Sequence, residues 1–177
     1  MKKLFSALSV LLVIASVSCD QKKGKTESAS PFRFEEYTIT LLQQGYDNGD
    51  FTITDVVQAY LDRIEAIDDG GPMLNAVIQV NPDALAIAAQ LDAELKEGKK
   101  RGPMHGVPVL LKDNIDTHDR METTAGSRAL KGSYPLQDSY VAMKLREAGT
   151  VIIGKANLSE WANFRGNLSS SGWSGVG

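Results

Sequence analysis

Apolar residues recur every three or four positions over residues 54–67, so that they fall on one face of a helix. Thr52 or Thr54 is suited to the N-cap of this helix, because a hydroxyl oxygen can accept a hydrogen bond from a free N–H group of the first turn. The Gly-Gly-Pro sequence at 70–72 is a stop signal. The pattern therefore predicts an amphipathic helix that packs one face on a core.

Two more helices are expected further along the chain. Asn81 can cap a helix that has Pro82 in its first turn, and this helix would run to Gly98. Asp138 can cap a third helix, which would end at Gly149.

Short apolar runs between these helices predict three strands, over residues 76–80, 107–111 and 150–153. The run at 107–111 is apolar without interruption, which is typical of a strand buried on both faces. A short helix is expected near residues 159–164. Because helices and strands alternate, the pattern predicts a layered α/β fold.

The start of the chain has a different pattern. Residues 1–18 combine two early lysines with an apolar run and small residues at the end, which is typical of a secretory signal peptide. The run is shorter than the about 20 apolar residues that a membrane-spanning helix needs. We therefore expect the protein to be exported.

Cys19 is the only cysteine, and its position directly after Ser-Val-Ser resembles a bacterial lipoprotein cleavage site, although Ser16 stands where such signals usually carry Leu. We expect a lipid on Cys19 that anchors the protein to a membrane, facing the periplasm or the cell exterior. Residues 19–31 are polar and would form a disordered tether. Residues 32–177 would then form the folded part.

Composition excludes several classes of function. The 177 residues are 42% hydrophobic and 23% charged, as in about one soluble domain, and the net charge of -3 provides no basic face for a nucleic acid. The two histidines, His105 and His118, lie thirteen positions apart without a cysteine pair, so neither is expected to bind a metal. No glycine-rich phosphate-binding motif is present. We expect neither a metal nor another cofactor.

Two lysines that follow apolar runs are candidates for acid–base chemistry. Lys112 follows Val-Pro-Val-Leu-Leu, and Lys155 follows Thr-Val-Ile-Ile-Gly. Either could be an ordinary strand-end lysine with its ammonium in water. A lysine that accepts a proton near neutral pH needs a buried site instead, because its pKa must fall from about 10.4 to about 7 or 8. The apolar run favours Lys112, since Gly154 loosens the approach to Lys155, but spacing alone leaves the choice open.

Three blocks of the sequence resemble the amidase signature family of serine hydrolases. They are GPMHGVPVLLKDNIDT at 102–117, METTAGSRAL at 121–130 and LREAGTVIIGKANLSEWANF at 145–164, in the family's order and at compatible spacing. The resemblance implies the amidase signature fold, with a mixed β-sheet layered between α-helices. Residues 32–177 would be the N-terminal part of that fold.

The resemblance also implies a mechanism. The family uses a Ser-cisSer-Lys triad, in which the lysine takes a proton from a bridging serine, and this serine deprotonates the nucleophilic serine that attacks the amide carbonyl. Lys112 matches the family's catalytic lysine, whereas Lys155 matches a lysine outside the triad. Ser127 matches the family's T-T-A-G-S block and has no triad role, so we expect it to be structural or near the site.

The two triad serines are expected beyond residue 177. Residues 169–171 (Ser-Ser-Ser) are similar to the loop of the bridging serine, but Trp173 follows where a small residue is expected. Peptide-amidase-like members of the family carry a similar S-G-W-S segment just ahead of the true loop. We therefore expect the chain to be the N-terminal part of an exported amidase that acts on a small-molecule or peptide amide, and to be inactive by itself.

Two alternatives stay open. The glutamine-hydrolysing subunit of a tRNA-dependent amidotransferase belongs to the same family, but export argues against it because its tRNA partner is cytoplasmic. A lipoprotein binding module on an amidase-like scaffold would have no chemistry and would lack the downstream serines.

Overall fold

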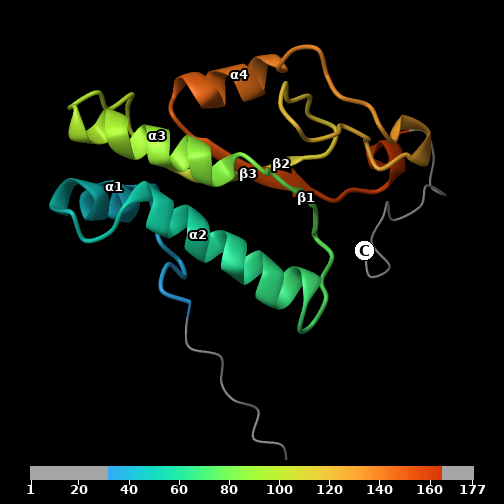
Figure 1. Ribbon diagram of the computed structural model, residues 1–177. Coiled ribbons are helices and arrows are strands. Elements are labelled where there is room, and N and C mark those ends of the chain that lie inside the picture. Colours follow the sequence, from blue (N-terminus) through green and yellow to red (C-terminus); the bar gives the residue numbers. More distant parts are fainter. Residues whose placement is uncertain (1–31, 165–177) are drawn as a thin grey trace, which may run out of the picture. The chain divides into compact units, whose positions relative to one another are not determined.

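The computed structural model describes residues 32–164 of the chain. This part contains the helices α1 (Ile39–Asn48), α2 (Ile53–Arg63), α3 (Ala84–Lys96) and α4 (Tyr140–Glu147), and the strands β1 (Val77–Val80), β2 (Pro108–Lys112) and β3 (Val151–Ala156) (Figure 1). A π-helical turn (Ile64–Asp69) extends α2, and 3-10 turns lie at Arg128–Leu130 and Glu160–Asn163. The α/β class predicted from the alternating pattern is confirmed.

The strands of this part form one mixed sheet in the order β1-β3-β2, in which β3 runs antiparallel to β1 and parallel to β2. The register between β2 and β3 has one irregularity: Val109 pairs with Ile152, but Leu110 pairs with Gly154. Ile153 is therefore an extra residue on β3, and the alternation of side chains along the strand shifts after it.

Helices cover both faces of the sheet. On one face, Val151 and Ile153 of β3 belong to a core cluster with buried residues of α1, α2 and α3. On the other face, Ile152 packs with Leu111 of β2 and Ala142 of α4. Figure 1 shows α4 on the opposite side of the strands from α2. The predicted layering of a mixed sheet between helices is confirmed.

The start of α2 is anchored twice. Thr52 is the N-cap, as predicted: its Oγ1 accepts a hydrogen bond from the N–H of Asp55, and the Asp55 carboxylate accepts one from the N–H of Thr52. The carboxylate of Asp92 in α3 accepts hydrogen bonds from the N–H groups of Ile53 and Thr54 at 2.8 and 3.0 Å. These bonds join the beginning of α2 to the side of α3.

The helical segment that begins with α2 stops at Gly70, as predicted, but α3 starts only at Ala84. Asn81 is buried; its Oδ1 accepts a hydrogen bond from the N–H of Asp83, and its Nδ2 donates to the carbonyl of Ile152 at 2.7 Å. Asn81 therefore turns the chain and fastens it to β3 instead of capping the helix directly.

The prediction that Asp138 caps α4 is wrong. The N-cap is Ser139, whose Oγ accepts a hydrogen bond from the N–H of Ala142. The Asp138 carboxylate instead accepts hydrogen bonds from the N–H of His118 at 2.7 Å and from Nε of Arg146 at 3.0 Å. These two bonds hold the Asp138 carboxylate away from the free N–H groups of the first turn.

The prediction that β2 is buried on both faces is also wrong for the described part of the protein. Leu111 is buried, but Leu110 is 41% exposed. β2 is an edge strand of the sheet that residues 32–164 form, and only the face bearing Leu111 packs on the cluster with α4. Within residues 32–164, the other face of β2, which bears Leu110, is therefore open.

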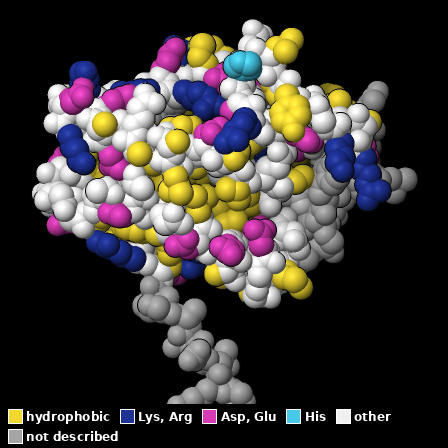
Figure 2. Space-filling model, viewed as in Figure 1, with side chains coloured by type: hydrophobic (Ala, Val, Ile, Leu, Met, Phe, Trp, Pro, Cys, Tyr) yellow, Lys and Arg dark blue, Asp and Glu magenta, His cyan; other side chains and the backbone are white. Residues whose placement is uncertain are grey.

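The face of the molecule in Figure 2 carries acidic and basic side chains interspersed around exposed apolar ones near its middle. None of the helices within residues 32–164 is long and apolar enough to cross a bilayer. The predicted signal peptide (1–18) and tether (19–31) lie outside the described residues.

Candidate active site

Lys112 is the last residue of β2 and pairs with Ala156 of β3. Its side chain is exposed, and within residues 32–164 its ammonium makes no hydrogen bond or ion pair. The expectation that Lys112 ends a buried strand is therefore wrong for the described part of the protein. Side chains alternate along a strand, so Lys112 points away from the face on which Leu111 is buried.

Asp113 follows Lys112 and is wholly buried. Its Oδ2 accepts hydrogen bonds from the N–H of Thr124 at 3.2 Å and from the Thr124 hydroxyl, and its carbonyl accepts one from the N–H of Ala125 at 2.9 Å. Its Oδ1 has no hydrogen-bond partner among the described residues. Burial raises the pKa of the Asp113 carboxyl, while the hydrogen bonds from Thr124 and the charge of Lys155 oppose that rise.

Lys155 is the lysine of this region that is buried. It pairs with Leu111 and points to the same face of the sheet. Its Nζ donates hydrogen bonds to the carbonyl of Ile115 at 2.7 Å and to Oγ1 of Thr123 at 2.9 Å. Burial lowers the pKa of the Lys155 ammonium, and the negative charge of Asp113 opposes that fall. A group enclosed in this way can hold a loop but does not face open space where a substrate could lie.

Ser127 is buried in the T-T-A-G-S turn. Its Oγ donates a hydrogen bond to the carboxylate of Glu160 at 2.8 Å, and its N–H donates to the carbonyl of Thr124 at 2.9 Å. The hydroxyl thus links this turn to the 3-10 turn at Glu160–Asn163, which is a structural use.

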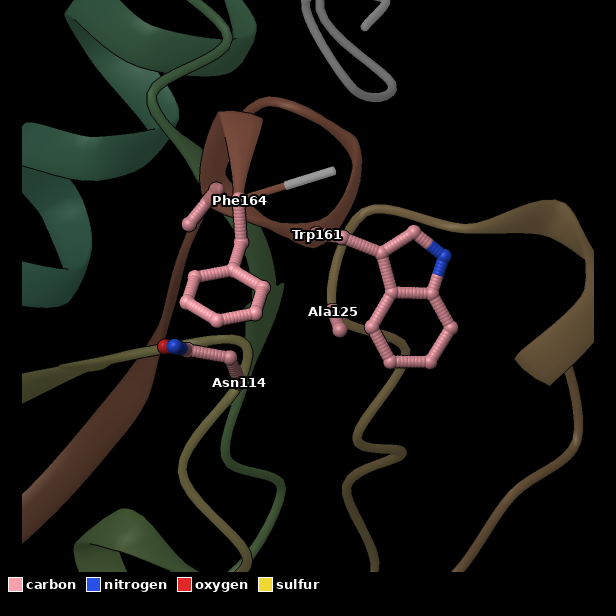
Figure 3. A pocket seen from close by; sticks show the side chains of 5 residues that line it. Asn114, Ala125, Trp161 and Phe164 are labelled. Atoms are coloured by element: carbon pink, nitrogen blue, oxygen red, sulfur yellow. The ribbon is translucent and has the colours of Figure 1, made fainter. Parts of the chain in front are cut away.

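A cavity of about 610 Å³ opens beside the K-D-N block, lined by Asn114, Ala125, Trp161, Ala162 and Phe164. Figure 3 shows the rings of Trp161 and Phe164 on two sides of the cavity, with Ala125 between them. Asn114 lies two positions after the candidate base, so the cavity is close to it along the chain. Two aromatic rings and one amide give this cavity the mixed lining that is typical of small-molecule sites.

The backbone that carries Trp161 is held in an unusual conformation. Trp161, Ala162 and Asn163 have φ angles of 52°, 53° and 60°. The left-handed region costs a non-glycine residue about 1–2 kcal/mol, so neighbouring contacts must maintain it. One such contact is the hydrogen bond from the N–H of Trp161 to the carbonyl of Ala125 at 2.8 Å. The N–H of Ala125 in turn donates a hydrogen bond to the carbonyl of Asp113. Backbone hydrogen bonds therefore connect the end of β2 to the wall of the cavity.

The ring nitrogens of both histidines contact backbone groups within residues 32–164. His105 is buried, with Nε2 3.0 Å from the carbonyl of Leu91, and the N–H of Arg101 donates to its Nδ1. His118 is exposed, and its Nδ1 lies 2.9 Å from the carbonyl of Pro135. Over residues 32–164, no group of three or more His, Cys, Asp or Glu side chains could hold a metal ion.

Sequence reasoning missed the roles of Asp113, Asn114 and Trp161. All three lie inside the quoted blocks, but polar residues after a strand carry no periodicity, so pattern alone gives no role to them. Only the folded chain brings the segments around residues 114, 125 and 161 to one cavity. Cys19 and the serines at 169–171 lie outside the described residues.

The chain is similar in sequence and structure to known amidases. The family model described as Amidase matches residues 55–172. The native peptide amidase of Stenotrophomonas maltophilia is 53% identical with a TM-score of 0.77, over 81% of this chain and 29% of that chain. An amidase family protein of Bacillus anthracis is 38% identical with a TM-score of 0.73, over 80% of this chain and 28% of that chain.

A further relative is a glutamyl-tRNA(Gln) amidotransferase subunit from Alkaliphilus metalliredigens, which is 40% identical over 131 residues, or 73% of this chain and 26% of the relative. The chain thus spans less than a third of the length of each of these proteins.

Proposed function

The chain belongs to the amidase family, and we propose that the complete protein hydrolyses a carboxamide C–N bond through an acyl-serine intermediate, with Lys112 as the base. The complete protein here means this chain together with the rest of an amidase domain, since the chain spans 29% of the matched peptide amidase. Two serines beyond residue 177 would complete the triad.

The position of Lys112 carries this proposal. It ends a strand, its ammonium is unengaged within residues 32–164, and Asn114 two positions later lines a cavity of about 610 Å³. Small-molecule sites commonly have volumes of roughly 300–1,000 Å³. Lys155 is less suited to proton transfer, because its Nζ is buried and bonded to two oxygen atoms of the protein. The dry surroundings that a lysine base needs would come from the remainder of the domain.

The proposed reaction moves one proton in each direction. The Lys112 amine takes the proton of the bridging serine, which takes the proton of the nucleophilic serine as its oxygen bonds to the amide carbon. The C–N bond then breaks, and the proton returns through the same groups to the leaving ammonia or amine. Water next cleaves the acyl-serine ester, which releases the carboxylic acid and restores the serine.

Substitution of the two lysines tests this assignment. In the complete protein, Lys112→Ala is expected to abolish turnover. A general base contributes about 10²–10⁴-fold to the rate, so the loss should be at least that large. Lys155→Ala is expected to act mainly on folding, because it removes a buried side chain with two hydrogen bonds. Release of ammonia or amine from peptide amides and other carboxamides measures turnover.

Lys96→Ala is the matched control, because it removes an exposed lysine from the end of α3 and should leave turnover unchanged. Comparable losses of turnover in soluble, folded Lys112→Ala and Lys155→Ala proteins would contradict the assignment.

A second candidate is the glutamine-hydrolysing subunit of a tRNA-dependent amidotransferase, which the 40% identity to an amidotransferase subunit favours. Both candidates use the same cleavage chemistry, so they differ in partner and location. A cytosolic protein that retains residues 1–18 and passes ammonia from glutamine to an acylated tRNA would support this second candidate over the first.

We also propose that the protein is exported and anchored through a lipid on Cys19. The support lies in the sequence: a basic start, an apolar run and small residues precede the only cysteine. A binding module without chemistry would share this anchor, but the coding sequence after residue 177 would then lack the two serines.

A further inference from the structure

Lys155 joins β3 to both ends of the segment that follows Lys112. Its Nζ donates hydrogen bonds to the carbonyl of Ile115, three positions after Lys112, and to Oγ1 of Thr123 at the start of the T-T-A-G-S turn. The side chain has no exposed surface. Because a buried ammonium is costly unless its donors are used, these two bonds fix the segment firmly against the strand.

Asp113 binds the same turn through the neighbouring threonine. Its Oδ2 accepts two hydrogen bonds from Thr124, the neighbour of Thr123. The two adjacent threonines therefore bridge a buried cation and a buried carboxylate. Attraction between Asp113 and Lys155 favours the charged form of each, in opposition to burial. No function assigned so far uses this pair.

We propose that Asp113 and Lys155 are positioning residues for Lys112: a buried charge pair that holds the turn after the base and sets the electrostatic field at its amine. This inference rests on the proposed function of Lys112. Neither residue touches the substrate. Lys155 points to the face of the sheet opposite Lys112, so the pair acts through the backbone and through its charges.

The charges around the pair determine the sign of its effect. Besides Asp113, the carboxylates of Asp116 and Asp119 favour the Lys155 ammonium, and the guanidinium of Arg146 opposes it. Removing the positive charge of Lys155 leaves an excess of negative charge behind Lys112, which favours the protonated amine. Removing the negative charge of Asp113 has the reverse effect.

Two isosteric variants of the complete enzyme test the proposal. Lys155→Met and Asp113→Asn are each expected to lower kcat with little change in KM. The loss should stay below the order of 10²-fold that a displaced catalytic group can cost, and therefore below the loss in Lys112→Ala. The acidic limb of the kcat/KM profile should move to higher pH in Lys155→Met and to lower pH in Asp113→Asn. The shifts are expected to be of the order of one pH unit, as for one unit charge nearby in a medium of effective dielectric constant about 20.

Thr123→Val is a second variant that serves if Lys155→Met does not fold. It removes only the hydroxyl that accepts a hydrogen bond from Lys155. It should lower kcat with KM nearly unchanged. Thr150→Val is the matched control: Thr150 is also a buried threonine, but its hydroxyl has no hydrogen-bond partner among the described residues. This variant should leave kcat, KM and the pH profile unchanged.

Two results would overturn the inference. Unchanged kcat per folded molecule in Asp113→Asn and in Lys155→Met or Thr123→Val would exclude a positioning role. A fall in activity without opposite shifts of the acidic limb in Asp113→Asn and Lys155→Met would show that the pair only supports folding. Lys112→Ala separates these results from failure of the proposed function, because full activity in that variant would remove Lys112 as the base.

Discussion

At the scale of the residue, Lys112 and Lys155 occupy neighbouring positions on paired strands but opposite environments. Lys155 pairs with Leu111 and shares its buried face, whereas Lys112 pairs with Ala156 and is exposed. Side chains on adjacent positions of a strand point to opposite faces. Lys155 is therefore buried on the face of its partner Leu111, whereas Lys112, the next residue of β2, has an accessible amine. The lysine that burial alone would favour as a base is thereby the one that holds the loop.

Gly106, in the block at 102–117, lies where the backbone comes close to side chains of α1 and α2. The carbonyl of Gly106 accepts a hydrogen bond from the Tyr46 hydroxyl at 2.9 Å. The φ angle of Gly106 is 77°. A Cβ on Gly106 would lie 2.5 Å from the side chain of Ile53. Glycine is therefore required here by both conformation and space.

Gly106→Ala is expected to destabilise the complete protein more than Gly98→Ala. Both positions have positive φ, which costs alanine about 1–2 kcal/mol, but Gly98 has open space around its would-be Cβ. The contact with Ile53 should add about 1–3 kcal/mol at Gly106. Urea denaturation of both variants measures the difference. Equal loss of stability in Gly106→Ala and Gly98→Ala would mean that the Ile53 side chain moves aside without a cost in free energy.

At the scale of the element, one arginine connects α3 to α4. Arg101 donates hydrogen bonds from Nε and Nη2 to the carboxylate of Glu94 in α3, at 2.7 and 2.5 Å, and from Nη1 to the carbonyl of Arg146 in α4 at 3.0 Å. The hydrogen bonds from Arg101 lower the pKa of Glu94 from 4.5 to about 2. This contact joins helices that lie on opposite faces of the sheet.

The Glu94 contact should make stability depend on pH. A carboxyl with a lowered folded-state pKa contributes stability above pH 4.5, and this contribution is lost as the pH falls toward about 2. Glu94→Gln should therefore lower the urea midpoint at pH 7 and have progressively less effect as the pH falls toward 2.

Glu97→Gln is the control for this experiment, because Glu97 pairs with Lys99 at the surface, where both side chains are at least 60% exposed. A loss from Glu94→Gln that is as large at pH 2 as at pH 7 would exclude the carboxylate as its source.

At the scale of the whole molecule, this chain carries one side of a proposed active site. Residues 32–164 supply Lys112 and the aromatic rings of Trp161 and Phe164 on two sides of the cavity, while the chain spans 29% of the matched peptide amidase. The proposed reaction needs two serines from the remainder of the domain. Export would bring this machinery to amides outside the cytoplasm.

Cys19→Ala tests the proposed anchor at this scale. In a bacterial host, the complete protein should fractionate with membranes and incorporate a fatty-acid label, and Cys19→Ala should lose both properties because lipid is attached through the thiol. Subcellular fractionation and labelling measure the outcome. Persistent membrane association of an unlabelled Cys19→Ala protein, or recovery of the unaltered protein from the cytoplasm, would contradict lipid anchoring.

Most of the fold was predictable from local pattern. The helical period over 54–67, with Thr52 or Thr54 as N-cap, predicted α2, and apolar runs predicted the strands, because both signals depend on neighbours in sequence. The cap of α4 was not predictable, since Asp138 is drawn away by Arg146, and both Asp138 and Ser139 are suitable caps. The site was predictable only as far as the resemblance reached, namely to Lys112, whose catalytic role stays a prediction.

The sequence by itself determined the class of fold, the family and the candidate base, because periodicity and motif order are properties of the linear chain. Only the tertiary structure decided which lysine is buried. It also brought Asn114, Ala125 and Trp161 to one cavity and joined Asp113 to Lys155 through Thr123 and Thr124. These relations depend on the register of β2 against β3, with its extra residue at Ile153, and register is set by pairing between segments that lie far apart in sequence.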